Sequence, residues 1–389
     1  MRILYHHRIM ADDGMRVHVD RVVDALTGAG HQVRVVGPAA SATSGETPAA
    51  RLRRWLPGWL FEGLELAYNV VAYRRLRRAA RALHCDVIYE RYNLYLLAGA
   101  LLKRRLGVPL ILEVNAPLAL ERRTHGNLHL VRLASICEQA AWRTADAVLP
   151  VSDALARHVM DAGVSADRVH VIRNAVTTDV LSMPKASAHA WPCGAVTFGF
   201  VGFVRAWHGL ERVIDVMAER SDVRLCVIGD GPARAELEAH AASLGVSERL
   251  SFTGRVAHAD VPGHLRAIDV ALQPDVTPYA SPLKVFDYMA ARCAIVAPAR
   301  SNIREILTDG VTALLFDPDD PAGFAHVVDR LAGDPALRAD LGEAAFAEIQ
   351  ARGFTWEDNA RRIAQIAGKL SRSGSASDVA EPAELREPS

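Results

Sequence analysis

Short apolar runs rich in β-branched residues alternate along this chain with amphipathic stretches of helix length. Residues 2–5 and 32–36 are two such runs, and residues 15–29 between them repeat apolar side chains with a helical period. Short runs that are apolar throughout predict strands covered on both faces, and their alternation with helices predicts a parallel sheet. Three further runs continue the pattern, at residues 86–90, 109–115 and 147–151. The first half of the chain is therefore predicted to be one doubly wound α/β unit.

A second unit of the same kind follows an irregular stretch. Between Thr177 and Gly194 the periodicity lapses into a composition with proline, serine and glycine that is typical of a domain junction. Four new strand-like runs then appear, at residues 197–202, 224–229, 270–273 and 294–297. With 389 residues, the chain is long enough for two domains that each bury a core. We expect two Rossmann-like domains facing a central cleft, at residues 1–180 and 195–352.

The C-terminal end divides into a helix and a tail. Thr355 is a suitable N-cap for a helix that runs to about Leu370. We expect residues 353–370 to pack back toward the N-terminal domain. Residues 371–389 are rich in Ser, Pro, Ala and Glu with almost no large apolar side chain, so we expect them to be disordered.

The composition excludes several classes of protein. The 45 Lys and Arg residues balance the 45 Asp and Glu residues, so no overall positive charge favours nucleic acid as a partner. The sequence has no apolar run of about 18 residues and no leader pattern, which favours a cytoplasmic location. Its five cysteines are scattered without CxxC spacing, which favours reduced thiols. The bias toward arginine and alanine indicates a GC-rich bacterial genome.

Residues 278–291 carry the strongest functional signal. A proline-bearing turn leads into a helix, so free N–H groups at Leu283 and Lys284 and the helix dipole converge where an anion would bind. Lys284 adds a full positive charge there. Asp287 lies three residues further on the same helical face, where its carboxylate would reach two ribose hydroxyls. The alternative is a capped surface helix whose Lys and Asp face water.

The order and spacing of motifs over most of the chain resemble glycosyltransferase family four. These motifs are the Gly14 loop and residues 151–155, 171–176, 228–232, 252–256, 281–291 and 354–357. The resemblance implies a retaining enzyme of the GT-B fold that uses a nucleotide-sugar donor. It also implies transfer on the front face without a protein nucleophile, the departing phosphate helping to deprotonate the acceptor.

A Glu-x7-Glu pair brackets the donor in this family. Asp287 stands at the second position, on the nucleotide ribose, and Tyr279 stands at the first, near the sugar or the phosphate. Asp keeps the ribose chemistry with a shorter reach, whereas Tyr removes a charge near the donor sugar. The resemblance implies a set of donor-binding residues: Gly14, Gly202, Phe203, Arg255, Val256, Tyr279, Ser281, Pro282, Leu283, Val285 and Asp287.

Residues 201–210 resemble the loop that carries an Arg and a Lys for the diphosphate in this family. Aligning the glycines places Phe203 at the Arg position and His208 at the Lys position, and Arg205 follows two residues after Phe203. Arg205 offers bidentate phosphate geometry, and His208 offers a hydrogen-bond donor to the β-phosphate. Arg205, His208 and Lys284 are therefore the predicted catalytic residues. The alternative is a solvent-facing Arg and a packed His.

Three residues of the first domain are candidates for binding the acceptor. His18 follows Gly14 into the first predicted helix. Glu113 and Asn115 end a predicted strand, where ligands collect in open parallel sheets. Many members of the family have a His close to the position of Asn115, so here an amide or Glu113 would orient the acceptor. For His18 the alternative is a packed side chain.

Residues 317–320 resemble the DxD metal-binding motif of other glycosyltransferases. They follow an apolar run and precede a helix that they can cap, so capping is the preferred interpretation. The sequence contains no HExxH, P-loop or GxSxG pattern. We expect no metal and no cofactor besides the nucleotide sugar as co-substrate.

A basic, tryptophan-bearing flank at residues 51–81 has two interpretations. It would rest on an anionic membrane, which suits a lipid-linked acceptor and a location at the inner face of the membrane. The alternative is a solvated helix face with a lid on the acceptor side.

The expected function is transfer of a hexose-type sugar from a UDP-linked donor to a hydroxyl of a small-molecule, glycan or lipid-linked acceptor. Two alternatives share the fold. One is a nucleotide-sugar epimerase or phosphorylase. The other is a nucleotide-sugar-binding protein that has lost catalysis, to which the missing glutamates give some weight.

Overall fold

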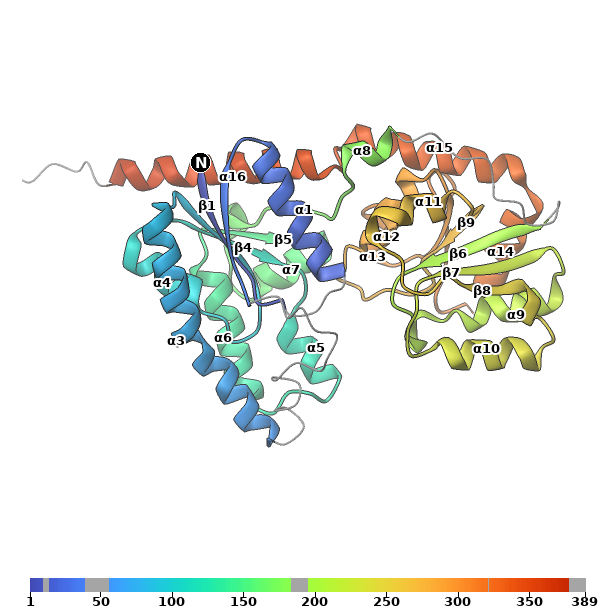
Figure 1. Ribbon diagram of the computed structural model, residues 1–389, viewed down its shortest axis with the longest axis horizontal. Coiled ribbons are helices and arrows are strands. Elements are labelled where there is room, and N and C mark those ends of the chain that lie inside the picture. Colours follow the sequence, from blue (N-terminus) through green and yellow to red (C-terminus); the bar gives the residue numbers. More distant parts are fainter. Residues whose placement is uncertain (10–13, 39–55, 183–194, 321, 378–389) are drawn as a thin grey trace, which may run out of the picture. The chain divides into compact units, whose positions relative to one another are not determined.

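The structure is a computed structural model that describes residues 1–9, 14–38, 56–182, 195–320 and 322–377 (Figure 1). The chain divides into two compact units. Unit 1 comprises residues 1–151 and 155–172 and the chain from Ala360 onward, and unit 2 comprises residues 152–154 and 173–359. Each unit holds a parallel α/β sheet, which confirms the fold predicted from the alternation of strands and helices.

The junction between the units differs from the predicted one. The periodicity assigns residues 173–180 to the first domain, whereas in the structure they belong to unit 2. The N–H of Asn174 donates to Ser281 Oγ at 3.1 Å, and the N–H of Val176 donates to the carbonyl of Phe354 at 3.1 Å. These bonds join residues that are more than a hundred positions apart, so local periodicity does not reveal them.

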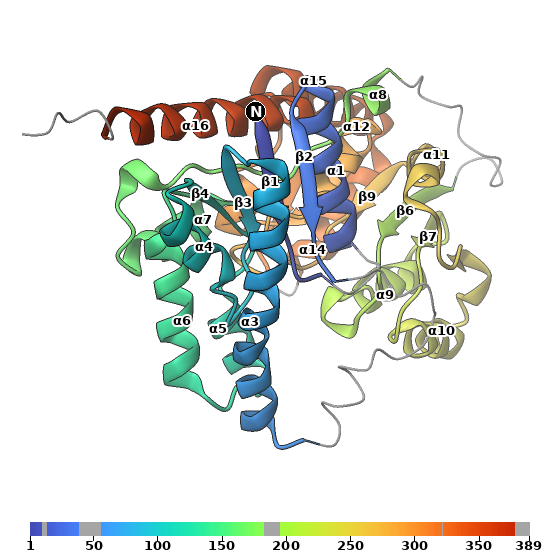
Figure 2. The same cartoon turned by 60° about the vertical axis from the view of Figure 1, so that its left-hand side comes forward.

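Unit 1 is built on a five-stranded sheet in the order β2-β1-β3-β4-β5. The strands are β1 (Arg2–His6), β2 (Gln32–Val36), β3 (Val87–Arg91), β4 (Leu110–Val114) and β5 (Ala147–Pro150). The helices before the junction are α1 (Gly14–Gly28), α3 (Gly58–Leu83), α4 (Ala98–Leu106), α5 (Leu118–Thr124), α6 (Val131–Thr144) and α7 (Asp153–Asp161). The winding direction reverses between β1 and β3, and α3 packs its buried face against β1 and β2 (Figure 2).

Unit 2 is built on a six-stranded sheet in the order β11-β10-β9-β6-β7-β8. The strands are β6 (Val196–Val201), β7 (Val223–Ile228), β8 (Leu250–Phe252), β9 (Val270–Leu272), β10 (Ala294–Pro298) and β11 (Leu314–Phe316). The helices are α8 (Thr178–Leu181), α9 (Glu211–Glu219), α10 (Arg234–Ser243), α11 (Val261–Leu265), α12 (Leu283–Ala290), α13 (Ser301–Arg304), α14 (Gly323–Gly333) and α15 (Pro335–Arg352). Here the winding direction reverses between β6 and β9.

Two apolar cores cover the two faces of the unit 2 sheet. One lies under α9, α10 and α14 and includes Phe198 and Phe200 of β6. The other lies under α11, α12 and α15 and includes Ala271 and Ile295. Strands that bury side chains on both faces read as continuous apolar runs, which explains why the sequence revealed them.

The closing helix α16 (Trp356–Ser377) is longer than predicted. The hydroxyl of Thr355 accepts the N–H of Asp358 at 3.1 Å, so Thr355 caps the helix as expected. From Ala360 onward the chain belongs to unit 1. The expectation of disorder over residues 371–389 is wrong for residues 371–377, which are helical, because adding turns to an existing helix is far easier than nucleating one. Residues 378–389 lie outside the described part of the chain.

None of the helices in the described residues combines the length and the apolar character that a membrane span requires.

Candidate functional site

The candidate residues of unit 2 gather at the carboxyl ends of its strands. Gly202 follows β6, Gly229 follows β7, and Thr253 follows β8. The turn that leads into α12 comes after β9, the neighbour of β6 at the point where the winding reverses. Open parallel sheets bind ligands at this kind of position, because the connecting loops diverge there.

Two glycines allow the loops after β6 and β7 to pack closely. Gly229 has a φ of 149°, and a Cβ there would lie 2.0 Å from the carbonyl oxygen of Gly202. A Cβ on Gly231 would lie 2.1 Å from the carbonyl oxygen of Val204. The N–H of Gly229 donates to Thr253 Oγ1 at 3.2 Å. The motif at residues 229–232 therefore supports the loop that carries Arg205.

Replacing Gly229 with alanine should displace this loop. We expect the free energy of unfolding to fall by about 3 kcal/mol, because the new methyl group overlaps a backbone carbonyl and the φ is strained for any other residue. Turnover should fall too, since the residues after Gly202 move. Urea unfolding and a transfer assay check this, with Gly263→Ala as the control because a Cβ there meets nothing within 4 Å. Equal stability of the two variants would contradict the packing argument.

Lys284 brings its ammonium group to the start of the β6 loop. Its Nζ lies 3.9 Å from the centroid of the Phe200 ring and 3.5 Å from where a Cβ on Gly202 would lie. Burial lowers the pKa of Lys284 to about 7. Among the described residues, no carboxylate forms an ion pair with Lys284. A cation held this way is poised for an anionic ligand.

His208 lies buried between Phe200 and Trp207, with ring centroids 4.7 and 3.9 Å away. Its Nδ1 accepts the N–H of Arg205 at 3.0 Å, so the proton of the neutral ring sits on Nε2. Burial, and then the positive charges of Lys284 and Arg205, lower the pKa of His208 to about 3. The ring is therefore a neutral hydrogen-bond donor at physiological pH.

Arg205 forms a polar cluster with Lys284 and His208, in which Arg205 and Lys284 supply positive charge and His208 supplies a neutral hydrogen-bond donor. Its side chain is exposed, and its guanidinium carbon lies 5.5 Å from the ring centroid of the half-exposed Phe203. The charges of Arg205 and Lys284 both act on His208, so the structure brings the three predicted catalytic residues into one neighbourhood.

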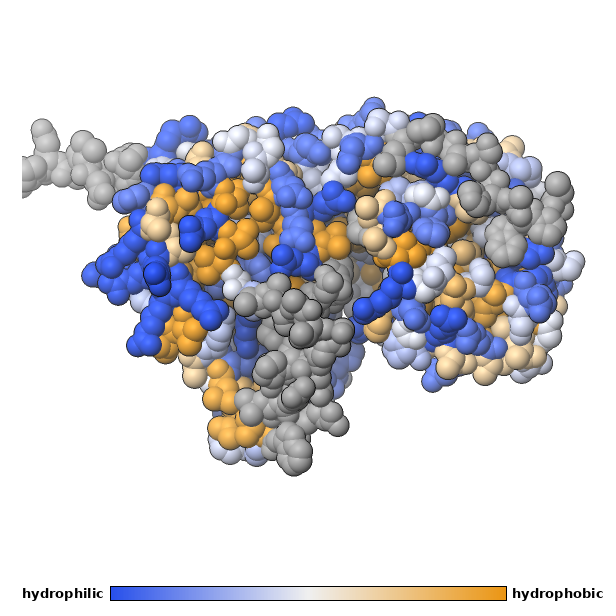
Figure 3. Space-filling view, in the orientation of Figure 1, coloured by the Kyte–Doolittle hydropathy of each residue, from blue (hydrophilic) through white to orange (hydrophobic). Residues whose placement is uncertain are grey.

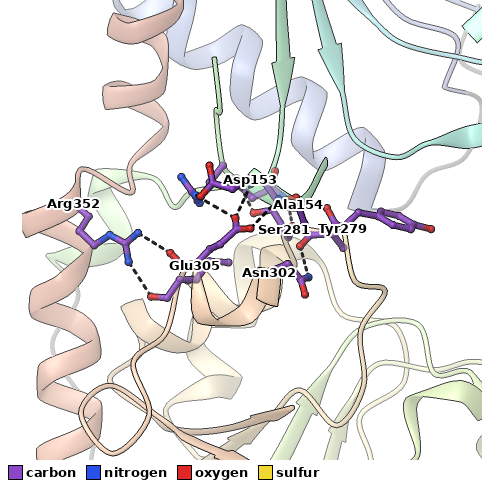
Figure 4. Close-up of polar contacts among 12 residues, drawn as sticks. Asp153, Ala154, Tyr279, Ser281, Asn302, Glu305 and Arg352 are labelled. Carbon is purple, nitrogen blue, oxygen red and sulfur yellow. Dashed lines mark hydrogen bonds and ion pairs between the residues drawn. The ribbon is translucent and has the colours of Figure 1, made fainter. Parts of the chain in front are cut away.

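The turn before α12 is held by three side chains that sequence reasoning gave no role. Asn302 Nδ2 donates to the carbonyls of Thr277 and Ala280 at 3.0 and 2.7 Å. Ser152 Oγ donates to the carbonyl of Tyr279 at 2.7 Å, and Asn174 Nδ2 donates to that of Ser281 (Figure 4). Bonds of this kind fix a backbone conformation, so they position the N–H groups at the start of α12. Each joins residues distant in sequence, which leaves no local signal.

Glu305 anchors the first turn of α7 in the same unit. Its carboxylate accepts the N–H groups of Asp153 and Ala154 at 2.8 and 3.0 Å and pairs with Arg173 at 3.1 Å (Figure 4). Arg352 donates to the backbone carbonyl of Glu305 at 2.6 Å. A carboxylate at a helix N-terminus is favoured by the helix dipole.

The remaining predicted donor residues differ in burial. Val285 lies in the core of unit 2, and Val256 packs against the same core. Arg255 is exposed. Four others are partly buried at the turn or on α12: Tyr279, Pro282, Leu283 and Asp287. Gly14 begins α1 in unit 1, and residues 10–13 before it lie outside the described part of the chain.

The predicted acceptor residues of unit 1 form one buried polar cluster. Oε1 of Glu113 lies 2.5 Å from Arg91 Nη1, 2.6 Å from Asn115 Nδ2 and 2.9 Å from His18 Nε2. Its Oε2 accepts the hydroxyl of Tyr89 at 2.8 Å. His18 and Arg91 hold the pKa of Glu113 well below its usual range despite complete burial. Both carboxylate oxygens are occupied by protein groups, so Glu113 orients its neighbours.

The DxD-like segment acts as a turn. Asp317 Oδ1 accepts the N–H of Asp319 at 3.0 Å, and Asp320 Oδ1 accepts the N–H of Ala322 at 3.0 Å, directly before α14. In the described ranges, no group of three or more His, Cys, Asp or Glu residues has the arrangement that a metal ion would need.

Two family models match the two halves of the chain. The model described as Glycosyltransferase Family 4 matches residues 13–180, and the model described as Glycosyl transferases group 1 matches residues 185–348. The chain belongs to glycosyltransferase family four. The resemblance inferred from the motifs is thereby confirmed, and the protein is an enzyme that transfers a glycosyl group from a nucleotide sugar.

Two relatives of this family-four glycosyltransferase are named for the acceptor or the group that they transfer. It is 26% identical over 306 residues to 2-deoxystreptamine glucosyltransferase from Streptomyces kanamyceticus, covering 74% of this chain and 78% of the relative. It is 25% identical over 384 residues to D-inositol 3-phosphate glycosyltransferase from Xylanimonas cellulosilytica, covering 91% of each. The solved structure of HepE from Anabaena, in complex with UDP, has a TM-score of 0.69 at 18% identity over 95% of this chain and all of that one. The fold is GT-B.

Proposed function

We propose that this family-four glycosyltransferase transfers a hexose from a UDP-linked donor to an acceptor hydroxyl with retention of configuration and without a metal ion. The observation that carries the proposal is the cluster of Lys284, Arg205 and His208 at the strand ends of unit 2. The UDP complex of HepE supports UDP as the nucleotide. We place the reaction in the cytoplasm of a bacterium, as the sequence suggests.

The diphosphate of the donor binds at the cationic cluster. Lys284 and Arg205 neutralise its charge, and the Nε2 proton of His208 donates to a phosphate oxygen. The first N–H groups of α12 point toward the same anion. As the bond between C1 of the sugar and the phosphate oxygen breaks, negative charge grows on the leaving group. These fixed groups stabilise that charge, which is the role that a metal ion has in other glycosyltransferases.

The acceptor hydroxyl attacks C1 from the face that the phosphate leaves. Its oxygen forms the new bond to C1, and its proton passes to the departing phosphate oxygen, so no protein nucleophile is needed. On α12, Asp287 accepts the hydroxyls of the ribose. Tyr279 lies near the sugar, where it offers a phenol ring in place of a carboxylate. In unit 1, His18 and Asn115 bind the acceptor and are oriented by Glu113.

A donor screen tests this function. Thermal unfolding with UDP-, GDP-, ADP- and dTDP-hexoses identifies the donor, because a ligand that binds the folded state alone raises the Tm. The hit is then incubated with 2-deoxystreptamine or inositol 3-phosphate, the acceptor types named for the relatives. We expect a UDP-hexose to give the largest shift and free UDP to appear only when acceptor is present. The anomeric proton coupling of the product should show retention, and EDTA should leave the rate unchanged.

Other results would replace the proposal. A changed sugar without acceptor indicates an epimerase, and a Tm shift without turnover for any acceptor indicates a nucleotide-sugar-binding protein. Loss of transfer in EDTA that Mg²⁺ restores contradicts metal independence. An inverted anomer contradicts transfer on the front face.

A further inference from the structure

The outer face of α3 is apolar along its first half. The exposed side chains there are Trp59, Leu60, Leu64, Val70 and Val71, and they recur at helical spacing. Trp59 is 56% exposed and Val70 is 55% exposed. Large apolar side chains scattered singly on a surface are ordinary, but a continuous stripe marks a contact surface.

The second half of the same outer face is basic. Arg74, Arg75, Arg78 and Arg81 are exposed and continue the line of the apolar stripe. The two acidic residues of α3, Glu62 and Glu65, are buried on its opposite face. Glu62 accepts the hydroxyl of Tyr95 at 2.7 Å, and Glu65 pairs with Arg122 at 2.6 Å. No acidic side chain of α3 therefore offsets the arginines.

Helix α4 packs against α3 and carries exposed residues of both kinds. Leu101 and Leu106 are exposed apolar residues, and Arg104 and Arg105 are exposed basic ones. Figure 3 shows hydrophilic residues gathered over the C-terminal end of α3 and α4, and hydrophobic residues over the N-terminal end of α3. We call the outer residues of α3 and α4 the α3–α4 face. Its positive charge stands in contrast to the zero net charge of the whole chain.

We propose that the α3–α4 face docks on an anionic lipid bilayer. The apolar stripe would lie at the boundary between headgroups and acyl chains, and the arginines would contact lipid phosphates. A helix with this pairing of Trp and Leu with arginine lies in the plane of a membrane surface, and each basic residue adds attraction to anionic lipid. This docking goes beyond the transfer reaction and does not depend on which sugar is moved.

Other partners fit this face less well. If two copies of the chain packed their α3–α4 faces together, arginines would face arginines, and α3 would supply no exposed acidic side chain to pair with them. Burying unpaired charge in this way is costly. Nucleic acid would pair with the arginines but leave Trp59 and Leu64 in water. A bilayer satisfies both halves of the face, because it offers phosphates and hydrocarbon a few ångströms apart.

Vesicle sedimentation of the full-length protein tests the proposal. Vesicles of phosphatidylcholine with phosphatidylglycerol are compared with vesicles of phosphatidylcholine alone. We expect binding to the anionic vesicles and much less to the neutral ones. Arg78→Glu and Leu64→Ser should each weaken binding about tenfold, the first by charge and the second by lost apolar burial. Two controls on exposed positions of unit 2, Arg330→Glu and Leu244→Ser, should bind like the wild type.

Three results would overturn the docking proposal. The first is that the wild-type protein stays wholly in the supernatant and so binds no vesicles. The second is equal binding by the Arg78→Glu and Leu64→Ser variants and their controls. The third is a concentration-dependent dimer in size-exclusion chromatography that Leu64→Ser abolishes, which assigns the face to a second copy. Circular dichroism, and UDP release with a water-soluble acceptor in the absence of vesicles, should be unchanged in all variants. Failure of docking is thus distinguishable from failure of transfer.

Discussion

Replacing Lys284 with methionine should lower the rate of glycosyl transfer roughly 10²- to 10³-fold while the folded protein becomes more stable. The rate falls because the variant lacks the cation that meets charge on the departing diphosphate. Stability rises because the wild type holds an ammonium group against Phe200 in a partly buried position, where desolvation penalises the charged form. We expect a gain of about 1–2 kcal/mol in the free energy of unfolding at pH 7.

The pH dependence of stability gives a second readout for the same variant. The pKa of Lys284 is about 7 in the folded protein and 10.5 in the unfolded chain, so the unfolded chain binds more protons between these values. The free energy of unfolding of the wild type should therefore rise with pH across this window, and the variant should lack this contribution. Urea unfolding at several pH values measures it, with Lys369→Met on the exposed side of α16 as the control. A near-normal rate of transfer by the Lys284→Met variant would contradict the proposal that Lys284 stabilises the departing diphosphate.

Replacing Glu113 with alanine should destabilise unit 1 by about 3–5 kcal/mol, because it leaves the buried Arg91 guanidinium without its counter-ion. The same change frees His18, Asn115 and Tyr89 from the group that orients them. Asp20→Ala is the matched control, since Asp20 pairs with Arg16 on the exposed side of α1, where a pair contributes less than about 1 kcal/mol. Equal unfolding free energies for the two variants would show that the buried cluster is not structural.

The acid sensitivity of the wild type should follow from the same carboxylate. The pKa of Glu113 is far below 4.5, its value in the unfolded chain, so its contribution is complete above pH 4.5. Below that pH the Glu113 carboxylate is protonated in the unfolded chain but not in the folded protein, so the free energy of unfolding falls as the pH falls. The Glu113→Ala variant should show a flatter decline.

Sequence reasoning located the strands well because they are buried on both faces. The run at residues 109–115 contains β4, the run at 294–297 lies within β10, and every residue of these two strands is buried. The start of α12 beside Lys284 was also predictable, because a turn, a helix start and a lysine follow one another directly in the chain. Interactions between residues that are neighbours in the sequence can be predicted without coordinates.

Features that depend on distant residues escaped prediction. Asn302 and Ser152 fix the donor turn from elsewhere in unit 2, and nothing near either residue indicates this role. The bonds of Glu113 to Tyr89, Arg91 and His18 likewise had no signal in the sequence. The 26-residue helix α3 was also missed as one element, because its outer face is apolar in one half and basic in the other, which blurs the amphipathic pattern.

The course of the chain through α7 limits how the enzyme can be divided. Residues 152–154 belong to unit 2, although the rest of the helix belongs to unit 1. A truncated fragment that starts at Arg173 therefore deprives Glu305 of both amide donors and the Tyr279 carbonyl of the Ser152 hydroxyl. An excised unit 2 therefore has to include residues 152–154, so a gene fusion that exchanges unit 2 between relatives needs three junctions in this part of the chain, at 151/152, 154/155 and 172/173.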